Sequence, residues 1–109
     1  MGYLHYKGYT GSVEYSEEDN CFFGYVLGLR RDGIMYEGDT AESLKKDFEE
    51  GIDDYLSQCR ESGRQAEKPF SGKTVIRIGS DLHKEAALKA RDQGISLNEF
   101  IQRAIVAAL

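Results

Sequence analysis

Acidic side chains are the most frequent reactive groups in the first two thirds of the chain, and three of them could form a nuclease-like site. Glu14 lies in a predicted strand, and Asp39 and Asp53 lie at the start and in the middle of a predicted helix. Carboxylates that converge on metal ions could hold the ions and the water of a hydrolytic centre. The sequence does not show whether these three carboxylates lie close together in the fold. The other acids fall in patterns typical of solvated turns and helix faces. We therefore expect no enzymatic activity and no cofactor.

Histidine and cysteine are too sparse to predict a metal site. His5 and His83 lie far apart, with no cysteine or carboxylate pattern around either of them. Cys21 and Cys59 are two lone thiols, too few for a structural zinc site or a disulfide-stabilised fold. Both are expected to be small apolar side chains in a reducing compartment.

Residues 73–78 alternate like a strand and carry cations on one face. The two faces hold Thr74, Ile76 and Ile78 on one side and Lys73, Val75 and Arg77 on the other. A two-stranded ribbon fits the major groove of B-DNA, where lysine and arginine donate to guanine and valine can contact a thymine methyl group. The second face is therefore the predicted base-contacting face. The local pattern also allows a fourth strand of the N-terminal sheet, with Arg77 in solvent.

The start of the last predicted helix could hold an anion. Ser96, Leu97 and Asn98 begin this helix, where free backbone amides and the positive end of the helix dipole suit a DNA phosphate. Ser96 and Glu99 also have the spacing of a capping box, in which each side chain satisfies a backbone amide. Capping and phosphate binding can share this turn, so both interpretations are kept.

Charge is divided unevenly along the 109 residues, whose net charge is −5. Residues 1–69 hold 8 Lys and Arg against 15 Asp and Glu, a net of −7. Residues 70–109 hold 6 against 4, a net of +2. An acidic body followed by a mildly basic tail suggests two tasks in one chain.

No apolar run approaches the roughly 18 residues that suggest a membrane span. The first nine residues lack the charged-then-apolar pattern of a signal peptide. We expect a cytoplasmic protein with no membrane partner.

The first part of the chain predicts a three-stranded antiparallel sheet covered by one helix. The predicted strands span residues 9–15, 21–27 and 34–37, with a tight turn at Asp32-Gly33. The middle strand is so aromatic and apolar that we expect it to be well buried. A helix then begins with Asp39 or Thr40 as its N-cap and ends before Gly63, and Gly51 inside it indicates a close approach to the sheet.

The second part predicts a strand–helix–helix unit. Residues 63–72 show neither helical nor strand periodicity and contain the only proline of the sequence, so they are the predicted linker. We place the domain boundary between residues 68 and 69, which gives domains 1–68 and 69–109. The two helices follow at about 81–93 and from 97 onward, separated by Gly94.

So small a unit cannot bury enough apolar surface alone. Two copies that pair their strands and interlock their helices would share one core. The predicted dimer core consists of Ile76, Ile78, Leu82, Phe100, Ile101 and Ile105. The overall fold class is α+β, and the expected state is an intertwined homodimer, with a tetramer through the N-terminal sheet as the alternative.

Both parts resemble known families. The run Lys73–Ile78, then Asp81-Leu82-His83, then Gly94–Ile101 resembles the Arc/MetJ-type ribbon-helix-helix family. The runs Tyr9–Tyr15, Glu37–Thr40 and Asp53–Leu56 resemble the HicB antitoxin family. The chain departs from the first family at Gly79-Ser80, where many members have proline, and at Val75, where a polar residue such as asparagine is common.

These resemblances imply a two-part antitoxin. The N-terminal domain would have a degraded RNase H-like fold and bind a small basic HicA-like toxin that cleaves mRNA, a partner that suits the acidic body. The C-terminal ribbon-helix-helix dimer would bind an inverted-repeat operator and repress the shared operon. The alternative is a toxin-independent transcriptional repressor whose N-terminal domain binds another protein or a ligand.

Overall fold

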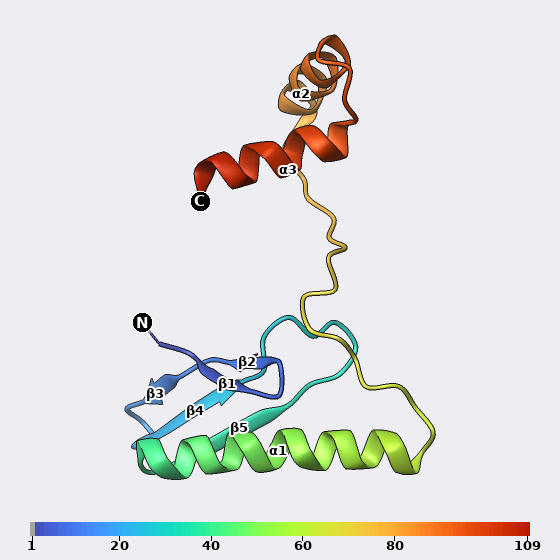
Figure 1. Cartoon of the computed structure of the whole chain (residues 1–109). Coiled ribbons are helices and arrows are strands. Elements are labelled where there is room, and N and C mark those ends of the chain that lie inside the picture. The colour runs from blue at the N-terminus through green and yellow to red at the C-terminus, as the bar shows by residue number, and fades with distance from the viewer. Residues whose placement is uncertain (1) are drawn as a thin grey trace. The chain divides into compact units, whose positions relative to one another are not determined.

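Five short strands and one long helix form the first part of the chain in the computed structural model, which describes residues 2–109 (Figure 1). The elements are β1 (Leu4–Tyr6), β2 (Tyr9–Gly11), β3 (Glu14–Ser16), β4 (Cys21–Tyr25), β5 (Met35–Gly38) and α1 (Ala41–Glu61). Strands β3, β4 and β5 form a three-stranded antiparallel sheet in that order, and β1 pairs with β2 in a hairpin. The predicted α+β class and the three-stranded sheet are confirmed.

The single strand predicted over residues 9–15 is in fact two strands, β2 and β3, so the prediction of one continuous strand was wrong. Both pieces run beside the same partner, because β3 pairs with β4 while Gly11 bridges to Val26 just beyond it. The break falls at Ser12, whose hydroxyl accepts the Tyr25 amide at 3.0 Å and whose carbonyl accepts the Tyr36 hydroxyl at 2.7 Å. Side-chain hydrogen bonds therefore interrupt the ladder here.

The β1–β2 hairpin was not predicted. Its two-residue turn consists of Lys7 and Gly8, with φ of 48° and 83°. Positive φ at both central residues matches the twist of a tight hairpin. The signal in the sequence was Lys-Gly between two tyrosines, which is weaker than the Asn-Gly or Asp-Gly pairs that usually mark such turns.

The predicted tight turn at Asp32-Gly33 was wrong. A longer loop joins β4 to β5, and Gly28, not Gly33, has the positive φ, 81°. The Asp32 carboxylate accepts hydrogen bonds from the Tyr55 hydroxyl at 2.6 Å and the Arg64 guanidinium at 3.0 Å. The aspartate therefore ties the loop to distant residues and does not shape a local turn.

Helix α1 begins and ends where the sequence predicts. Thr40 is the N-cap, and it forms a capping box with Ser43. Gly63, with φ of 67°, ends the helix while the Arg64 amide donates to the Cys59 carbonyl at 2.9 Å, as in a Schellman motif. A Cβ on Gly51 would lie 3.3 Å from an Ile34 methyl group, so the predicted close approach to the sheet side is confirmed.

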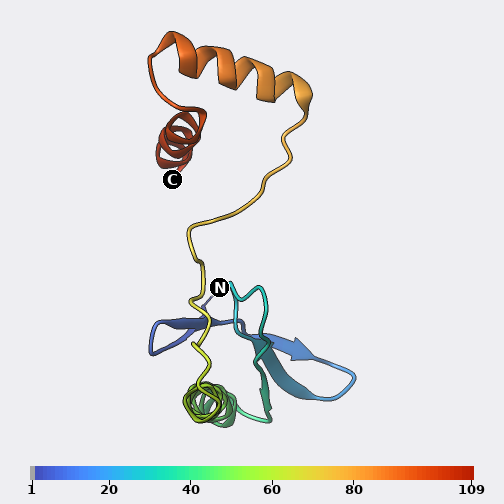
Figure 2. The ribbon, with the colours of Figure 1, turned by 90° about the vertical axis from the view of Figure 1, so that its right-hand side faces the viewer.

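Helix α1 covers one face of the three-stranded sheet, as Figure 2 shows in a view nearly along the helix axis. The core between them contains Tyr9, Val26, Ile34, Tyr36, Leu44, Phe48 and Ile52. The Tyr36 ring packs edge-on against Phe48, with centroids 5.0 Å apart. Gly11 and Gly24 leave the space for it, since a Cβ on either glycine would overlap the Tyr36 ring or hydroxyl.

A second unit, residues 74–109, contains helices α2 (Ser80–Asp92) and α3 (Leu97–Ala108). Gly94, with φ of 72°, ends α2 as predicted. Residues 73–79 form neither helix nor strand and are not part of the first unit's sheet. The fourth-strand interpretation is therefore wrong, and pairing with a second copy stays a prediction. No helix among residues 2–109 combines the length and apolarity needed to cross a membrane.

The predicted linker is attached to the first unit over much of its length. Glu67 and Phe70 donate backbone hydrogen bonds to the Tyr55 hydroxyl and the Gly28 carbonyl, at 2.8 Å and 3.0 Å. The two compact units divide between Lys73 and Thr74. Residues 64–70, which we call the strap, therefore pack as part of the first unit.

Candidate functional site

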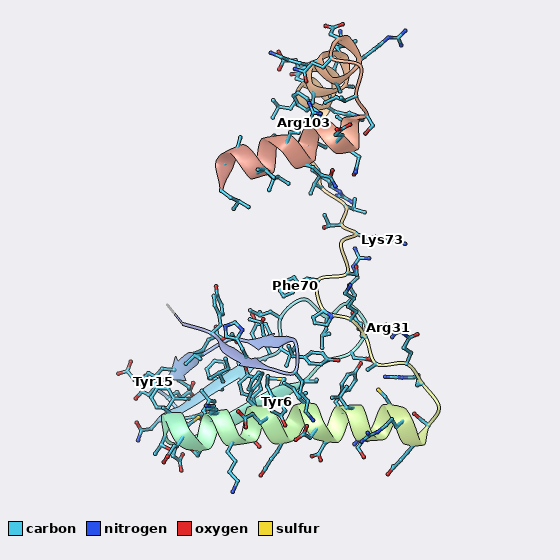
Figure 3. The ribbon with its side chains drawn as sticks, viewed as in Figure 1. Tyr6, Tyr15, Arg31, Phe70, Lys73 and Arg103 are labelled. Carbon is cyan, nitrogen blue, oxygen red and sulfur yellow. The ribbon has the colours of Figure 1, made fainter. Side chains whose placement is uncertain are left out.

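The predicted base-contacting residues are all exposed. Lys73, which Figure 3 labels, precedes the second unit, and Val75 and Arg77 follow in a stretch without secondary structure. The Val75 side chain is 85% exposed, which is unusual for an aliphatic residue. The prediction that Lys73, Val75 and Arg77 share one outward face is not tested by one copy of the chain. Only a paired strand would fix which side chains point outward.

The two isoleucines of this segment line a mostly apolar hollow of about 320 Å³ in the second unit, which the predicted base-contacting residue Arg77 and His83 also line. Ile76 and Ile78 face it from the segment, and Leu97 and Ile101 face it from α3. The structure thus brings three predicted dimer-core residues together, along with one residue predicted to lie near a phosphate. Ile76 nevertheless remains 52% exposed, so the hollow is open and not a finished core.

The remaining predicted core residues are also uncovered. Leu82 is 58% exposed, Ile105 is 53% exposed, and Phe100 is half-buried. Within residues 74–109 the one fully buried side chain is that of Ala90. Two helices therefore contact each other here while most of their large apolar side chains face solvent.

The start of α3 is capped from one side. The Ser96 hydroxyl accepts the Glu99 amide at 3.0 Å, as predicted. The Glu99 carboxylate does not complete the capping box, because it pairs with Arg103 at 2.9 Å one helical turn later. The Leu97 and Asn98 amides lie in the first turn, where no helical carbonyl is available to them. Their contact with a phosphate stays a prediction.

Asp53, one of the three acids considered for a nuclease-like site, is engaged by two other side chains. Asp53 accepts hydrogen bonds from Lys7 at 2.7 Å and from Tyr6 at 2.9 Å. The Lys7 hydrogen bond, with that from Tyr6, lowers the pKa of Asp53. Among residues 2–109, no three histidine, cysteine, aspartate or glutamate side chains lie close enough to hold a metal ion.

Both cysteines are free thiols in the first unit. Cys59 is buried on α1, and Cys21 is half-buried at the start of β4. Burial, with the neighbouring Glu37 carboxylate, raises the pKa of the Cys21 thiol. The Cys21 thiol is therefore not activated as a nucleophile by these surroundings.

The face of the sheet opposite α1 is uncovered, which the sequence did not predict. Phe23 and Tyr25 on β4 pair in register with Glu37 and Met35 on β5, and all four share this face. Met35 is 77% exposed and Tyr25 46%, so the expectation that the strand over 21–27 is well buried was wrong for this face. The glutamate opposite Phe23 was the signal that one side of the sheet meets water.

Acids surround the apolar centre of this face. A surface pocket of about 450 Å³ is lined by Phe23 and Met35 together with Asp19, Glu37 and Asp47. Asp47 also accepts the Glu37 amide at 2.9 Å, which occupies a donor at the edge of β5. We call Phe23, Tyr25, Met35, Asp19 and Glu37 the open sheet face, and Asp47, which belongs to α1, lies at its β5 edge. This face combines aromatic and thioether contacts with negative charge.

Comparison with known proteins bears mainly on the second unit. The HicB family model matches residues 55–105, slightly less than half of the chain. The comparison with curated proteins gave no match, and neither did the comparison with solved structures. The matched segment runs from the end of α1 through the strap and into both helices of the second unit, and this match supports a HicB-type protein.

Proposed function

We propose that the chain is the antitoxin of a type II toxin–antitoxin pair, which neutralises a HicA-like mRNA-cleaving toxin and represses its own operon. The second unit would bind operator DNA as a ribbon-helix-helix homodimer, and the first unit would bind the toxin. The observation that carries the proposal is the uncovered apolar surface of residues 74–109. The family match is consistent with it.

A second copy is the economical cover for that surface. Burying a leucine or isoleucine side chain contributes about 1.5–3 kcal/mol relative to leaving it exposed. Ile76, Leu82 and Ile105 are each more than half exposed in one copy. In a two-fold symmetric contact, the same side chains are buried on both copies, so each contributes twice. Such a contact would also give the unpaired segment 73–78 an antiparallel partner, which makes the two-stranded ribbon.

The ribbon would then read bases while the α3 start fixes its position. Lys73, Val75 and Arg77 would face the major groove. The free amides near Ser96 would hold a phosphate on each side. Neither role involves a covalent step, so the chemistry is recognition by charge, hydrogen bonds and shape.

The open sheet face suits a basic toxin. Its apolar residues supply contact area, and Glu37, Asp19 and Asp47 supply charge opposite to that of an RNA-binding protein. Exposed aromatic and thioether side chains are enriched at interface centres. A nuclease held against this face would lose access to RNA by occlusion.

Arg77→Ala tests the DNA half. We expect a loss of about 1–3 kcal/mol in specific binding and a relaxed sequence preference, because a bidentate contact to guanine is removed. Lys89→Ala, on an exposed cation of α2, is the control and should change specific binding little. Mobility-shift titration against the duplex upstream of the gene, with a scrambled duplex beside it, measures both. Unchanged affinity and preference for the arginine variant would contradict the groove assignment.

Glu37→Lys tests the toxin half. Co-expression with the product of the neighbouring gene should give a complex with the wild-type chain and little or none with this variant. Glu50→Lys makes the same charge change on the exposed side of α1 and should retain the complex. If the wild-type chain binds DNA but neither copurifies with nor inhibits a basic neighbour, the chain is a repressor without a toxin.

A further inference from the structure

The strap is held by one carboxylate that accepts three consecutive backbone amides. Glu67 accepts the Arg30 amide in a short hydrogen bond, the Arg31 amide at 2.9 Å and the Asp32 amide at 3.0 Å. Successive amides that point into one concavity form an anion-binding nest. The Glu67 carboxylate occupies this nest, so the β4–β5 loop and the strap are joined.

This junction brings together cations from two distant parts of the sequence. Arg30 and Arg31 come from the loop, and Arg64 and Lys68 come from the strap. All four line one surface pocket of about 520 Å³, which also contains Ser71. Figure 3 labels Arg31 on this loop. The cations therefore share one surface, which we call the basic pocket.

Cations outnumber carboxylates at the basic pocket. Glu67 keeps its negative charge while it accepts the three amides, and Asp32 pairs with Arg64 at 3.0 Å, so four cations face two carboxylates. Among residues 2–109, no carboxylate lies within 4.0 Å of the charged nitrogens of Arg30, Arg31 or Lys68. A cluster of unpaired cations is unexpected in a part of the chain that is otherwise acidic.

We propose that the basic pocket binds the phosphate backbone of the DNA duplex that the second unit holds, which rests on the proposed DNA binding. Arginine recognises phosphate through two parallel hydrogen bonds. Ser71 lines the pocket, and one residue, Gly72, separates it from the segment 73–78 that holds the predicted base-contacting residues. A duplex held by that segment is tethered to the first unit, so its phosphates reach the basic pocket at high effective concentration. An acidic protein partner would have no such tether.

The experiment is a salt titration of DNA binding by the full chain. The variant Arg30→Gln/Arg31→Gln removes two cations but keeps the backbone amides that hold Glu67. Lys45→Gln/Lys46→Gln removes the same charge from the exposed side of α1 and is the control. The two probes are the duplex upstream of the gene and a scrambled duplex of equal length, and near-ultraviolet tyrosine dichroism checks that each variant is folded.

We expect the arginine double variant to weaken binding to both duplexes by the same factor. Each lost phosphate contact should reduce the slope of log K against log salt by about 0.9 per chain, so the slope falls by up to about 2 per chain. The lysine control should keep the wild-type slope. Sequence preference should be unchanged, in contrast to Arg77→Ala.

A slope that the arginine double variant leaves unchanged would overturn this inference while the proposed function stands. Unchanged DNA binding with a weaker complex with the neighbouring protein would also overturn it and assign the pocket to a protein partner. A wild-type chain that binds neither duplex would overturn both proposals.

Discussion

At the scale of single residues, the first unit depends on two glycines that make room for Tyr36. A Cβ on Gly24 would overlap the Ser12 carbonyl oxygen and the Tyr36 ring. Burial raises the pKa of the Tyr36 hydroxyl to about 12, and this hydroxyl donates to the Ser12 carbonyl at 2.7 Å. The tyrosine therefore cannot move aside without breaking a part-buried hydrogen bond.

Gly24→Ala should consequently destabilise the first unit by at least about 2 kcal/mol, because backbone as well as side chain must shift. Gly33→Ala is the matched control, since nothing lies within 4 Å of its added Cβ. Urea unfolding followed by tyrosine fluorescence measures both free energies of unfolding. Equal stabilities for the two variants would show that the sheet relaxes around the new methyl group.

Residues whose roles are local were predictable from the sequence, and residues with distant partners were not. Thr40 was one of two predicted N-caps, and Gly51 was read as an approach to the sheet, because capping and helix periodicity are read within one or two turns. Asp32 was taken for a turn residue. Its partners, Tyr55 and Arg64, lie 23 and 32 positions later, where a local pattern carries no information.

At the scale of elements, the strap is the part that periodicity describes least well. Its hydrogen bonds to Gly28, Tyr55 and the loop amides replace a regular ladder, so it shows neither a helical nor a strand pattern. The helices were predicted closely because their caps and stripes are local. The break at Ser12 and the long β4–β5 loop were missed because tertiary hydrogen bonds decide them.

The attachment of the strap should depend on pH through Glu67. Hydrogen bonds from the Arg30, Asp32 and Arg31 amides lower the pKa of Glu67 below its ordinary 4.5. A lowered folded-state pKa contributes stability above the unfolded pKa, and this contribution disappears as pH falls through the folded pKa. Glu67→Gln should therefore have a lower thermal midpoint than the wild type at neutral pH.

Below the folded pKa of Glu67, the wild-type carboxyl is neutral and resembles the glutamine, so the two midpoints should converge. Thermal unfolding monitored by near-ultraviolet dichroism at a series of pH values checks this. Glu17→Gln, in an exposed hairpin turn, should show no comparable convergence. A constant difference between wild type and Glu67→Gln across the series would mean that the charge does not hold the strap.

At the scale of the whole molecule, the two units differ in how complete their cores are. The first unit buries Phe48 and Ile52 completely and has no need of a partner for its core. The second unit buries Ala90 and leaves the predicted dimer-core residues Leu82 and Ile105 more than half exposed. From size and patterning, the sequence predicts that a second copy covers these side chains, and this shared core stays a prediction.

Dilution should therefore unfold the second unit before the first. Stability that comes from association falls with protein concentration, whereas stability within one chain does not. All seven tyrosines, Tyr3, Tyr6, Tyr9, Tyr15, Tyr25, Tyr36 and Tyr55, lie in the first unit. Helices α2 and α3, with 13 and 12 residues against 21 in α1, supply more than half of the helical signal.

Far-ultraviolet dichroism should accordingly lose up to about half of its helical intensity on dilution, while the tyrosine signal stays constant. Ile101→Asp, which puts a charge in the apolar hollow, should give the diluted spectrum at every concentration. Lys84→Asp, on an exposed position of α2, should behave like the wild type. A helical signal that is independent of concentration, in a chain whose sedimentation shows a monomer, would mean that α2 and α3 are stable without a second copy, and the ribbon would then have no partner strand.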